Sequence, residues 1–567
     1  MLEKFCIGLV RILLGGILLF LTMLSAFVTC RVYGGSEIVQ YGRDSLFLHL
    51  FFGAGVIGLT VFYRRRKERK RLVGKEKVQN GGEERKRICR KNQWLLLAAA
   101  AYLFWILLVP SWGGSDSHQC MASAQGLLQG DFSAWEPVAY SYGTAEGPLG
   151  YAYTYPSQNG LILYMAVLVF FFGDVAYAVF QILNIGFFIL GIVSLQRMTV
   201  RGNERCSLLL WMACCLPFSF YILFVYGTMP GFGLSCLAME RLMRYVEEGR
   251  GRDFWIGAAA VAAAVILKSN YEIVLVALFL YLASSGVFRR KARLLVAAVL
   301  LITVYVIGNR GIQTGISSVT GRTVSDGAPM IAWVQMGLEE SKRGPGWYNG
   351  YQVKLFQKAD GDADLAAAWA QADLRKTISD MAEEPAKAAD FFVRKIESIW
   401  AEPTFQSLWI QEVGNTSWAE ESPPWELFKE EGGLNRLYVF AANLVQTFVY
   451  AMACVWVIAG MSAKGSRSKH VLMKRTWEKR IEAEKTVKAV KKQGMETVWE
   501  RQERGEPDRW GMLLPGIVFI GGFLFHLVWE AKGQYSVVYF MLLLPYAYLG
   551  MERVADVFLD VTGAGKE

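Results

Sequence analysis

The chain has 567 residues, 53% of them hydrophobic and 14% aromatic, and its mean hydropathy is +0.26. Its net charge of +10 does not indicate nucleic-acid binding, because the basic residues gather in short stretches beside apolar runs, as at 64–91 and 461–510. This placement follows the positive-inside rule, so we expect these stretches to lie in the cytoplasm, close to anionic lipid.

Many apolar runs approach the roughly 20 residues that a helix needs to cross a bilayer. Only helices or closed barrels satisfy the backbone in lipid, so we predict an all-α, polytopic transmembrane bundle of about 12 or 13 spans in the plasma membrane. No Ala-x-Ala site follows the first run, which is therefore expected to be a retained anchor. The predicted spans are 6–28, 45–63, 94–110, 175–196, 206–226, 254–285 (broken at Lys268), 293–308, 434–460, 511–529 and 535–550, with 160–172 and 229–245 as shorter candidates.

Four regions follow from the order of spans and loops. The first two spans are expected to form an appendage, because the polar residues of chemical interest begin only near residue 111. The regions are 1–92 (two N-terminal spans and a basic cytoplasmic linker), 93–308 (a transmembrane core with a first outer loop at 111–157), 309–433 (a helical extracytoplasmic segment) and 434–567 (C-terminal spans with a basic cytoplasmic segment at 461–510).

The run 160–172 has two possible arrangements. Basic residues at 197–205 favour the cytoplasm, yet two full crossings from the outer loop would leave them outside. Either 160–172 is re-entrant or interfacial, or Phe172-Gly173-Asp174 is a tight turn between two spans and 197–205 is an exception to the charge rule.

The segment 309–433 is acidic, with twelve Lys and Arg against nineteen Asp and Glu, and contains no cysteine. Two helical patterns, 363–385 and 387–403, carry apolar faces that either lie on the membrane surface or pack on each other. No Cys-x-x-Cys or His-rich spacing occurs in the chain, so no metal or other cofactor is expected.

Polar and charged residues interrupt or end several spans on the predicted outer side. Ionisable groups at such depths are costly and are usually functional or paired. The pairs Lys268–Glu272 and Glu530–Lys532 could equally be ion pairs that only stabilise span ends. The outer residues of interest are Asp116, His118, Tyr155, Gln158, Lys268, Glu530, Lys532 and Tyr535.

Together these residues suit a site with one general base and cationic and aromatic support. Lys268 and Lys532, with Arg310 as a further candidate, match a phosphate-bearing group. His526 lies one helical turn before Glu530, but a lone intramembrane histidine is more often a core residue, and we assign it no catalytic role. A sugar could stack on Trp112, Tyr155, Trp347 or Tyr348.

Two segments, 115–135 and 153–174, resemble the opening of the GT-C fold glycosyltransferases, most closely bacterial relatives of the dolichyl-phosphate-mannose protein mannosyltransferases (glycosyltransferase family 39). In that family an outer-loop Asp follows an early span, a helix ends in Gly, and a Tyr-Pro element opens the next apolar helix. The matching positions are Asp116, Gly130 and Tyr155-Pro156. Further matches are the Glu-x-Lys-x-x-Tyr element in 529–550, and 328–350 with 391–405.

The resemblance implies an inverting transfer of a sugar from a polyprenyl-phosphate donor to an extracytoplasmic acceptor that it does not identify, with no cofactor. Asp116 would deprotonate or orient the acceptor hydroxyl. Lys268, Lys532 and Arg310 would neutralise the leaving phosphate, while Glu530 holds Lys532. The residues implied to support the site or bind substrate are His118, Tyr155, Gln158, Glu530 and Tyr535.

Two other functions stay open. One is a transporter or flippase for lipid-linked or small polar substrates, although no internal repeat is visible and the long outer segment is unusual for a simple carrier. The other is a non-catalytic scaffold of GT-C type. It is kept open because Thr228, in YGTMPG (226–231), stands where relatives commonly carry an acidic residue.

Overall fold

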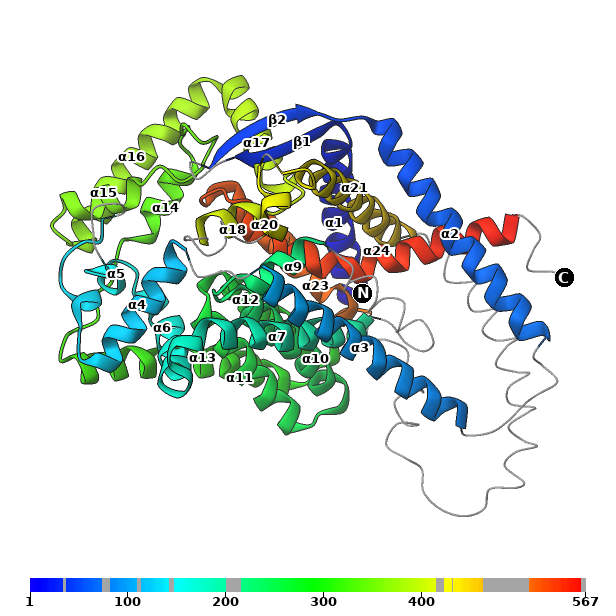
Figure 1. Ribbon diagram of the computed structural model, residues 1–567, viewed down its shortest axis with the longest axis horizontal. Helices are drawn as coiled ribbons and strands as arrows, with labels where there is room; N and C mark the ends of the chain where they lie inside the picture. Colours follow the sequence, from blue (N-terminus) through cyan, green and yellow to red (C-terminus); the bar gives the residue numbers. More distant parts are fainter. Residues whose placement is uncertain are drawn as a thin grey trace, which may run out of the picture.

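The computed structural model describes residues 1–33, 37–73, 82–109, 114–141, 147–199, 216–414, 423–430, 432–461 and 509–561. Within these ranges the chain is largely helical, and eight helices are long and apolar enough to cross a membrane (Figure 1). The prediction of a helical bundle is confirmed, and the length and composition of these eight helices agree with a multi-pass membrane protein. The count is below 12 or 13 in part because 160–172 and 175–196 fall within one candidate, Pro156–Thr199, and because 200–215 lies outside the described residues.

The N-terminal part departs from the all-α prediction by one hairpin. Its two antiparallel strands pair Val28 with Arg43 and Tyr33 with Ile38, and the strands are rich in the β-branched and aromatic residues that favour a pleated surface. The elements of this part are α1 (Leu2–Phe27), β1 (Val28–Tyr33), β2 (Ile38–Arg43), α2 (Leu46–Val73) and α3 (Gly82–Leu108).

The N-terminal helix lies along the C-terminal part of the bundle. α1 runs antiparallel to α21 (Asn435–Ala459): the Thr447 hydroxyl donates to the Ser25 carbonyl at 3.2 Å, and Gly15 lies beside Val457. The backbone N–H of Cys30 in β1 donates to the Ala401 carbonyl at 2.9 Å. The first region is thus packed into the rest of the molecule.

The central part is a bundle whose helices run between two ends of the molecule. The apolar run 254–285 forms two helices with a short turn at Lys268, as the break in its sequence predicted. The elements are α4 (Asp116–Gln129), η1 (Ser133–Trp135), α5 (Tyr151–Thr154), η2 (Pro156–Gln158), α6 (Asn159–Phe172), η3 (Gly173–Val175), α7 (Ala176–Thr199), α9 (Leu216–Leu223), α10 (Thr228–Glu248), α11 (Gly251–Leu267), η4 (Ser269–Tyr271), α12 (Glu272–Arg289) and α13 (Ala292–Thr320).

Helix α6 does not carry the chain from one end to the other. It starts beside the Lys268 turn, where Gly160 contacts the Ile266 carbonyl. Helix α7 starts at that same end, because Asn184 donates to the Ile222 carbonyl at 3.0 Å, and it finishes at the far end, where Arg197 lies 3.5 Å from Glu240. This geometry favours the re-entrant or interfacial arrangement of 160–172.

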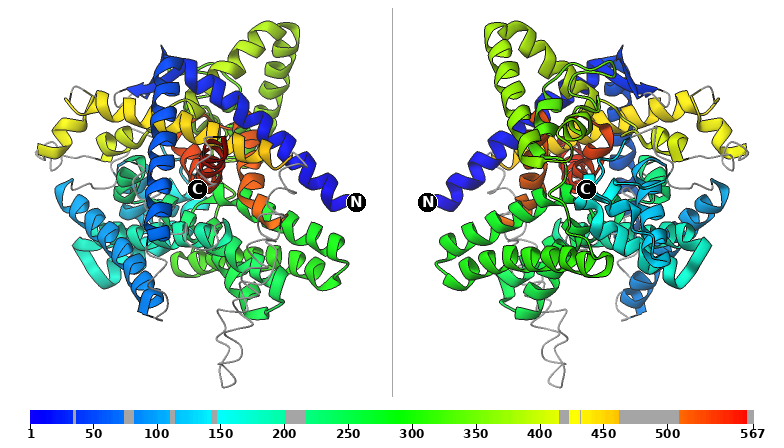
Figure 2. Two further views of the ribbon diagram at one scale, coloured as in Figure 1. Left: turned by 90° about the vertical axis from the view of Figure 1, so that its right-hand side faces the viewer. Right: turned by 90° about the vertical axis from the view of Figure 1, so that its left-hand side faces the viewer.

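The segment after α13 forms a helical cap, which stands above the green helices in Figure 2. Helix α17 turns its apolar face toward the bundle: Trp400 packs on Phe519, Phe523 and Tyr539. The elements here are α14 (Met330–Gly337), α15 (Tyr351–Lys358), α16 (Ala363–Glu383), α17 (Pro385–Trp400), α18 (Ser407–Gly414) and α20 (Pro423–Phe428).

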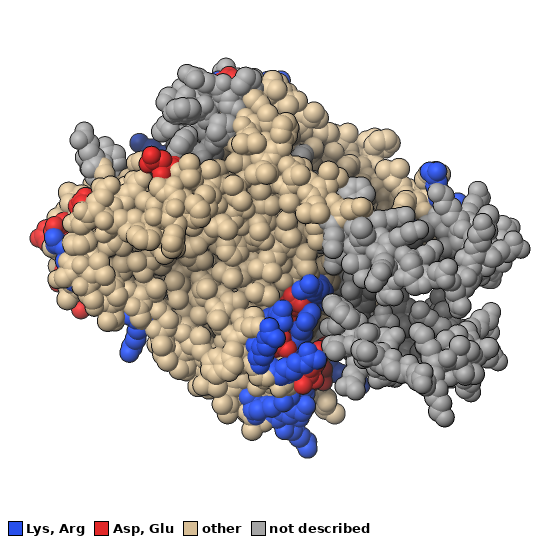
Figure 3. Space-filling model, turned by 60° about the horizontal axis from the view of Figure 1, so that its bottom comes forward, with Lys and Arg blue, Asp and Glu red and all other residues tan. Residues whose placement is uncertain are grey.

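The chain then returns to the bundle through α21, η6 (Gly511–Leu513), α23 (Leu514–Val528) and α24 (Gly533–Val561). The predicted basic segment 461–510 lies almost wholly outside the described residues. Figure 3 shows Lys and Arg gathered with a few acidic residues on one part of the surface, while much of that face carries no charge. An uncharged surface of this extent fits a bundle embedded in lipid.

Candidate functional site

Asp116 lies in the first turn of α4, where a carboxylate interacts favourably with the helix dipole. The Tyr151 hydroxyl donates to its Oδ1 at 3.2 Å. The preceding residue, Ser115, has φ 51° and ψ −126°, a conformation that costs energy for a residue with a side chain. Backbone strain of this kind clusters at functional sites, which makes this helix start a candidate for one.

A hydrogen-bonded chain leads from Asp116 into the bundle. Cys120 contacts the Tyr151 hydroxyl at 3.7 Å and the Gln158 Oε1 at 3.9 Å, and Gln158 Nε2 donates to the Tyr226 hydroxyl at 2.6 Å. Burial raises the pKa of the Cys120 thiol, and the nearby Asp116 charge raises it further, so this cysteine stays neutral. The predicted site residue Gln158 therefore connects α4 to the residues around Lys268.

Lys268 ends α11 and is almost fully buried. Its Nζ donates to the Thr228 hydroxyl at 2.8 Å and lies 4.7 Å from the ring centre of Tyr226. Burial lowers the pKa of Lys268 to about 7; the Asp116 charge opposes this shift, whereas the Lys532 charge adds to it. Both charged groups therefore act on Lys268, although they come from distant parts of the chain.

The alternative of a Lys268–Glu272 ion pair is wrong. Glu272 instead accepts a hydrogen bond from the Tyr305 hydroxyl at 2.9 Å, and Lys268 turns toward Thr228. The turn η4 lies between the two residues in the chain.

Lys532 occupies the loop between α23 and α24, between two carboxylates. Its Nζ lies 3.8 Å from Glu530 Oε1 and 3.6 Å from Glu37 Oε1. Burial alone would lower the pKa of Lys532, but the charges of Glu37, Glu530 and Asp116 outweigh it and raise the pKa. The predicted Glu530–Lys532 pair therefore forms, with Glu37 as a third member.

Glu530 is buried and holds its proton more tightly than an ordinary carboxyl group. Burial raises its pKa to about 7; the Lys532 charge opposes that shift, and Glu37 and Asp116 add to it. Its Oε2 accepts a hydrogen bond from the Tyr535 hydroxyl at 3.3 Å. Tyr535 also faces Lys268, whose Nζ lies 5.8 Å from its ring centre.

Glu37 is a site residue that sequence analysis missed. It lies at the start of the second strand of the N-terminal hairpin, is 2% exposed, and forms an ion pair with Arg343. The one available signal was its position: a single acidic residue after Gly-Gly-Ser, between two spans on the predicted outer side. Nothing in the local sequence shows that the hairpin reaches Lys532.

The loop that carries Glu530 and Lys532 is fixed by the cap. The ammonium of Lys395, fully buried in α17, donates to the carbonyls of Gly337 and Trp529. The Ala531 N–H donates to the Gly346 carbonyl at 2.8 Å. These bonds attach α14 and α17 to the loop, so the cap helps to place Lys532.

The aromatic residues that were predicted to stack on a sugar differ in how far they are buried. Trp347 is fully buried and its indole N–H donates to Ser398 at 2.9 Å, so the prediction that it offers a face to a sugar is wrong. Tyr348 is half-buried, with Lys532 Nζ 5.6 Å from its ring centre. Tyr155 packs against Tyr151 and Trp333. Trp112 lies outside the described residues.

Two of the predicted site residues do not contact Lys268 or Lys532. His118 is exposed on α4, two residues after Asp116, and Arg310 is exposed on α13. The structure records no contact between either of them and the two lysines. His526 is buried and stacks on Tyr535 with ring centres 5.4 Å apart, in agreement with the core role expected for it.

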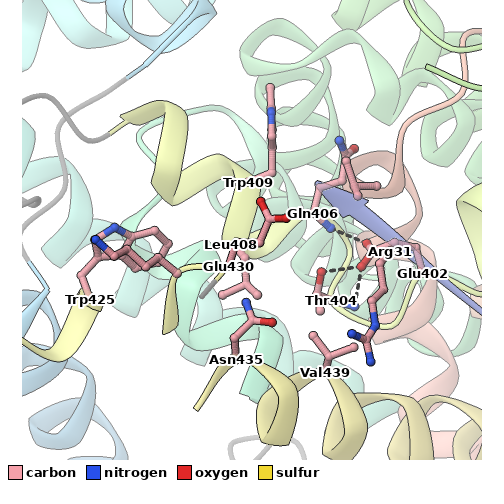
Figure 4. A pocket seen from close by; sticks show the side chains of 12 residues that line it. Arg31, Glu402, Thr404, Gln406, Leu408, Trp409, Trp425, Glu430, Asn435 and Val439 are labelled. Atoms are coloured by element: carbon pink, nitrogen blue, oxygen red, sulfur yellow. Dashed lines mark hydrogen bonds between the residues drawn. The ribbon is translucent and has the colours of Figure 1, made fainter. Parts of the chain in front are cut away.

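Two pockets lie beside the two buried lysines, Lys268 and Lys532. One lies between α12 and α24 and is lined by apolar residues such as Val274 and Val538 and by polar residues that include Lys268, Asn270 and Gln534. The other is polar and is shown in Figure 4, with Arg31, Glu402, Gln406, Trp409, Trp425 and Asn435 among the residues that line it.

In the polar pocket, Glu402 accepts hydrogen bonds from the backbone N–H groups of Thr404 at 3.0 Å and Gln406 at 2.5 Å. Burial raises the pKa of Glu402 to about 7, although these hydrogen bonds work against the shift. Phe405 and Gln406 have φ of 52° and 56°, so Glu402 holds a strained turn beside Lys532.

The described residues contain no group of three or more His, Cys, Asp or Glu side chains that could hold a metal ion. The polar residues at hand are suited to proton transfer and to binding an anion: a carboxylate at a helix start, two buried lysines and several phenols. In comparisons with protein-family models, curated proteins and solved structures, no match to the chain was found.

Proposed function

We propose that this protein is an integral-membrane glycosyltransferase of GT-C type, with about 12 or 13 spans, that moves a sugar from a polyprenyl-phosphate donor to an extracytoplasmic acceptor. One observation carries the proposal: a chain of contacts runs from Asp116 through Tyr151, Cys120 and Gln158 to Tyr226, whose ring centre lies 4.7 Å from Lys268 Nζ. A base candidate connected in this way to a buried cation, with Lys532 as a second cation, suits transfer from a phosphate leaving group.

The distribution of charge supports an extracytoplasmic site. The end of the bundle opposite Lys268 carries the basic residues of α10 and the start of α11, with ion pairs Arg241–Asp253 and Arg244–Glu240. The positive-inside rule assigns such an end to the cytoplasm. Lys268 would then face the side where lipid-linked rather than nucleotide-linked sugars are the available donors.

The pocket between α12 and α24 supports a lipid-linked donor. Lys268 in its lining suits a phosphate oxygen, while the prenyl chain of the donor would lie in the surrounding lipid. Lys532 would bind the same phosphate from the other side. Arg310 is exposed on α13, and we propose it as a further contact for the donor phosphate.

The reaction proposed for this geometry has one displacement step. Asp116 accepts the proton of the acceptor hydroxyl while the hydroxyl oxygen forms a bond to the anomeric carbon. The bond from that carbon to the phosphate oxygen breaks, and its electron pair passes to the phosphate. Lys268 and Lys532 stabilise the negative charge that develops there.

The test is transfer from a radiolabelled polyprenyl-phosphate sugar by the purified protein, together with the lipid-linked sugar profile of cells that lack it. We expect Asp116→Asn to abolish transfer and Lys268→Met to weaken it. Exposed Asp326→Asn and Lys376→Met serve as matched controls. Accumulation of one polyprenyl-phosphate sugar after deletion would name the donor. Unchanged transfer by Asp116→Asn would show that the base is another group.

A lipid flippase is the second candidate, and the buried Lys268 beside the pocket between α12 and α24 is the observation that favours it. A carrier would move a labelled polyprenyl phosphate across a vesicle membrane without consuming the sugar bond. Movement without transfer would favour the carrier, and binding with neither would favour a non-catalytic scaffold.

A further inference from the structure

Lys532 lies at nearly equal distances from two carboxylates that differ in how they are held. Glu530 Oε1, 3.8 Å away, is buried and has no hydrogen-bond partner among the described residues. Glu37 Oε1, 3.6 Å away, also accepts a hydrogen bond from Gln406 Nε2 at 3.1 Å, while Oε2 pairs with Arg343. Glu37 is therefore fixed on both oxygens, whereas Glu530 is the more easily displaced partner.

The groups that hold Glu37 are themselves fixed. Gln406 is in a strained turn, its N–H bonded to Glu402 and its side-chain oxygen accepting from the Gln534 N–H at 3.2 Å. The guanidinium of Arg343 lies 5.3 Å from the ring centre of Tyr348. The position of Glu37 is thus set by two segments of the cap and by the start of α24.

The hairpin that carries Glu37 is attached on both strands. In β1, Cys30 N–H donates to the Ala401 carbonyl at 2.9 Å, and in β2, Val39 N–H donates to the Arg343 carbonyl at 2.9 Å. At its base, Asp44 accepts from the Thr29 hydroxyl at 2.8 Å and lies 3.0 Å from His49. A hairpin attached in this way delivers a carboxylate to a defined point.

We propose that Glu37 is a positioning residue for Lys532: it holds the ammonium in place when a substrate phosphate displaces Glu530, so that the N-terminal hairpin completes the site. This inference rests on the proposed function. A phosphate oxygen carries the negative charge of the Glu530 carboxylate that it replaces, and a lysine that keeps one fixed anionic partner stays at the leaving oxygen during the reaction.

The proposal predicts a separation of binding from turnover. Glu37→Gln removes one negative charge near the phosphate, so the Kd for a polyprenyl phosphate in detergent micelles should stay the same or fall. The kcat of transfer should fall roughly tenfold or more, since Lys532 is no longer held at the leaving oxygen. Glu383→Gln, exposed on α16, is the matched control. Unchanged kcat in Glu37→Gln would overturn the proposal.

A double variant separates positioning from general support of the fold. In a Lys532→Gln background, Glu37→Gln should cause no further loss of kcat, because the residue it positions is gone. Additive losses would contradict the proposal. If Glu37→Gln cannot be purified, Gln406→Met replaces it: this change keeps the Glu37 charge, loosens its position, and should lower kcat in the same direction.

A measurement without substrate distinguishes this inference from the proposed function. Loss of the Glu37 charge should lower the pKa of Lys532, so that a small amine-reactive reagent at pH 8 labels Lys532 more in Glu37→Gln than in the wild type, as measured by peptide mass spectrometry. Lys376 labelling should not change. If Lys532 is labelled equally in Glu37→Gln and in the wild type, the inference is overturned even if the protein transfers sugar. If labelling of Lys532 increases in Glu37→Gln but the wild type transfers no sugar, only the proposed function is overturned.

Discussion

The ammonium of Lys268 donates a hydrogen bond to the hydroxyl of Thr228 at 2.8 Å. A carboxylate here would neutralise Lys268. A hydroxyl satisfies one of its three N–H groups without cancelling its charge, which leaves the cation available to an anionic ligand. The choice of a hydroxyl rather than a carboxylate at residue 228 therefore affects what Lys268 can bind.

Introducing a carboxylate at residue 228 should weaken the proposed site. We expect Thr228→Asp to pair with Lys268, raise its pKa above the wild-type value of about 7, and increase the Kd for polyprenyl phosphate by at least about tenfold. Thr228→Ser, which keeps the hydroxyl, is the control and should bind like the wild type. Binding by Thr228→Asp as tight as that of the wild type would mean that Lys268 does not contact the phosphate.

The affinity for polyprenyl phosphate should increase as the pH falls from 8 to 6. Burial lowers the pKa of Lys268 to about 7 and raises that of Glu530 to about 7. Below pH 7 Lys268 gains a positive charge and Glu530 loses a negative one, so both changes favour an anion. Titration of Kd against pH in buffers of constant ionic strength measures the effect.

Two variants identify the groups responsible for this pH dependence. Lys268→Met and Glu530→Gln should each flatten part of the profile, because each removes one titrating group. A profile that is flat in the wild type, or that keeps its full slope in both variants, would exclude these two residues as its origin.

Some of this site could be predicted from the sequence. Lys268 interrupts an apolar run and Asp116 follows one, and burying charge is costly enough that such residues stand out. Glu37 and Lys395 could not be predicted in the same way. Their importance comes from contacts with segments that lie more than a hundred residues away in the sequence. Glu37 pairs with Arg343, and Lys395 donates a hydrogen bond to the Trp529 carbonyl.

The fold, like the site, could be predicted only in part from the sequence. Hydrophobic length is a local property, so the helical bundle could be expected, but whether α6 crosses the membrane depends on where its ends pack. The contact of Gly160 with Ile266 and the bond of Asn184 to Ile222 settle which end of the bundle α6 and α7 share. Charge counting alone left both arrangements open.

Removal of the Lys395 amine should destabilise the attachment of the cap. Lys395→Met leaves the carbonyls of Gly337 and Trp529 without this donor in a buried site, at a cost of about 1–3 kcal/mol. Thermal unfolding followed by intrinsic tryptophan fluorescence should show a lower Tm, whereas exposed Lys376→Met should not change it. An unchanged Tm in Lys395→Met would mean that the two carbonyls find other donors.

The same lysine should make stability depend on pH. Burial lowers the pKa of Lys395 to about 7, below the value of 10.5 expected in the unfolded chain. Between these values the unfolded chain binds the extra proton, so its contribution to stability should rise with pH from 7 toward 10.5 and be smallest below 7. The difference in Tm between wild type and Lys395→Met, measured at pH 7 and pH 9, should therefore be larger at pH 9. A difference that shrinks with rising pH would contradict this assignment.

The turn that carries Lys268 depends on close approach at Gly227. A Cβ at this position would lie 2.3 Å from the Leu267 carbonyl oxygen and 2.8 Å from Lys268 Cβ, so the backbone of one segment must move. Gly227→Ala should therefore lower stability by about 1–3 kcal/mol and shift Lys268 away from Thr228, weakening the binding of polyprenyl phosphate. Gly186→Ala is the matched control, since a Cβ there meets nothing within 4 Å and alanine favours a helix. If the Gly227 variant binds and melts like the control, Lys268 is not held by this contact, and its hydrogen bond to Thr228 alone must set its position.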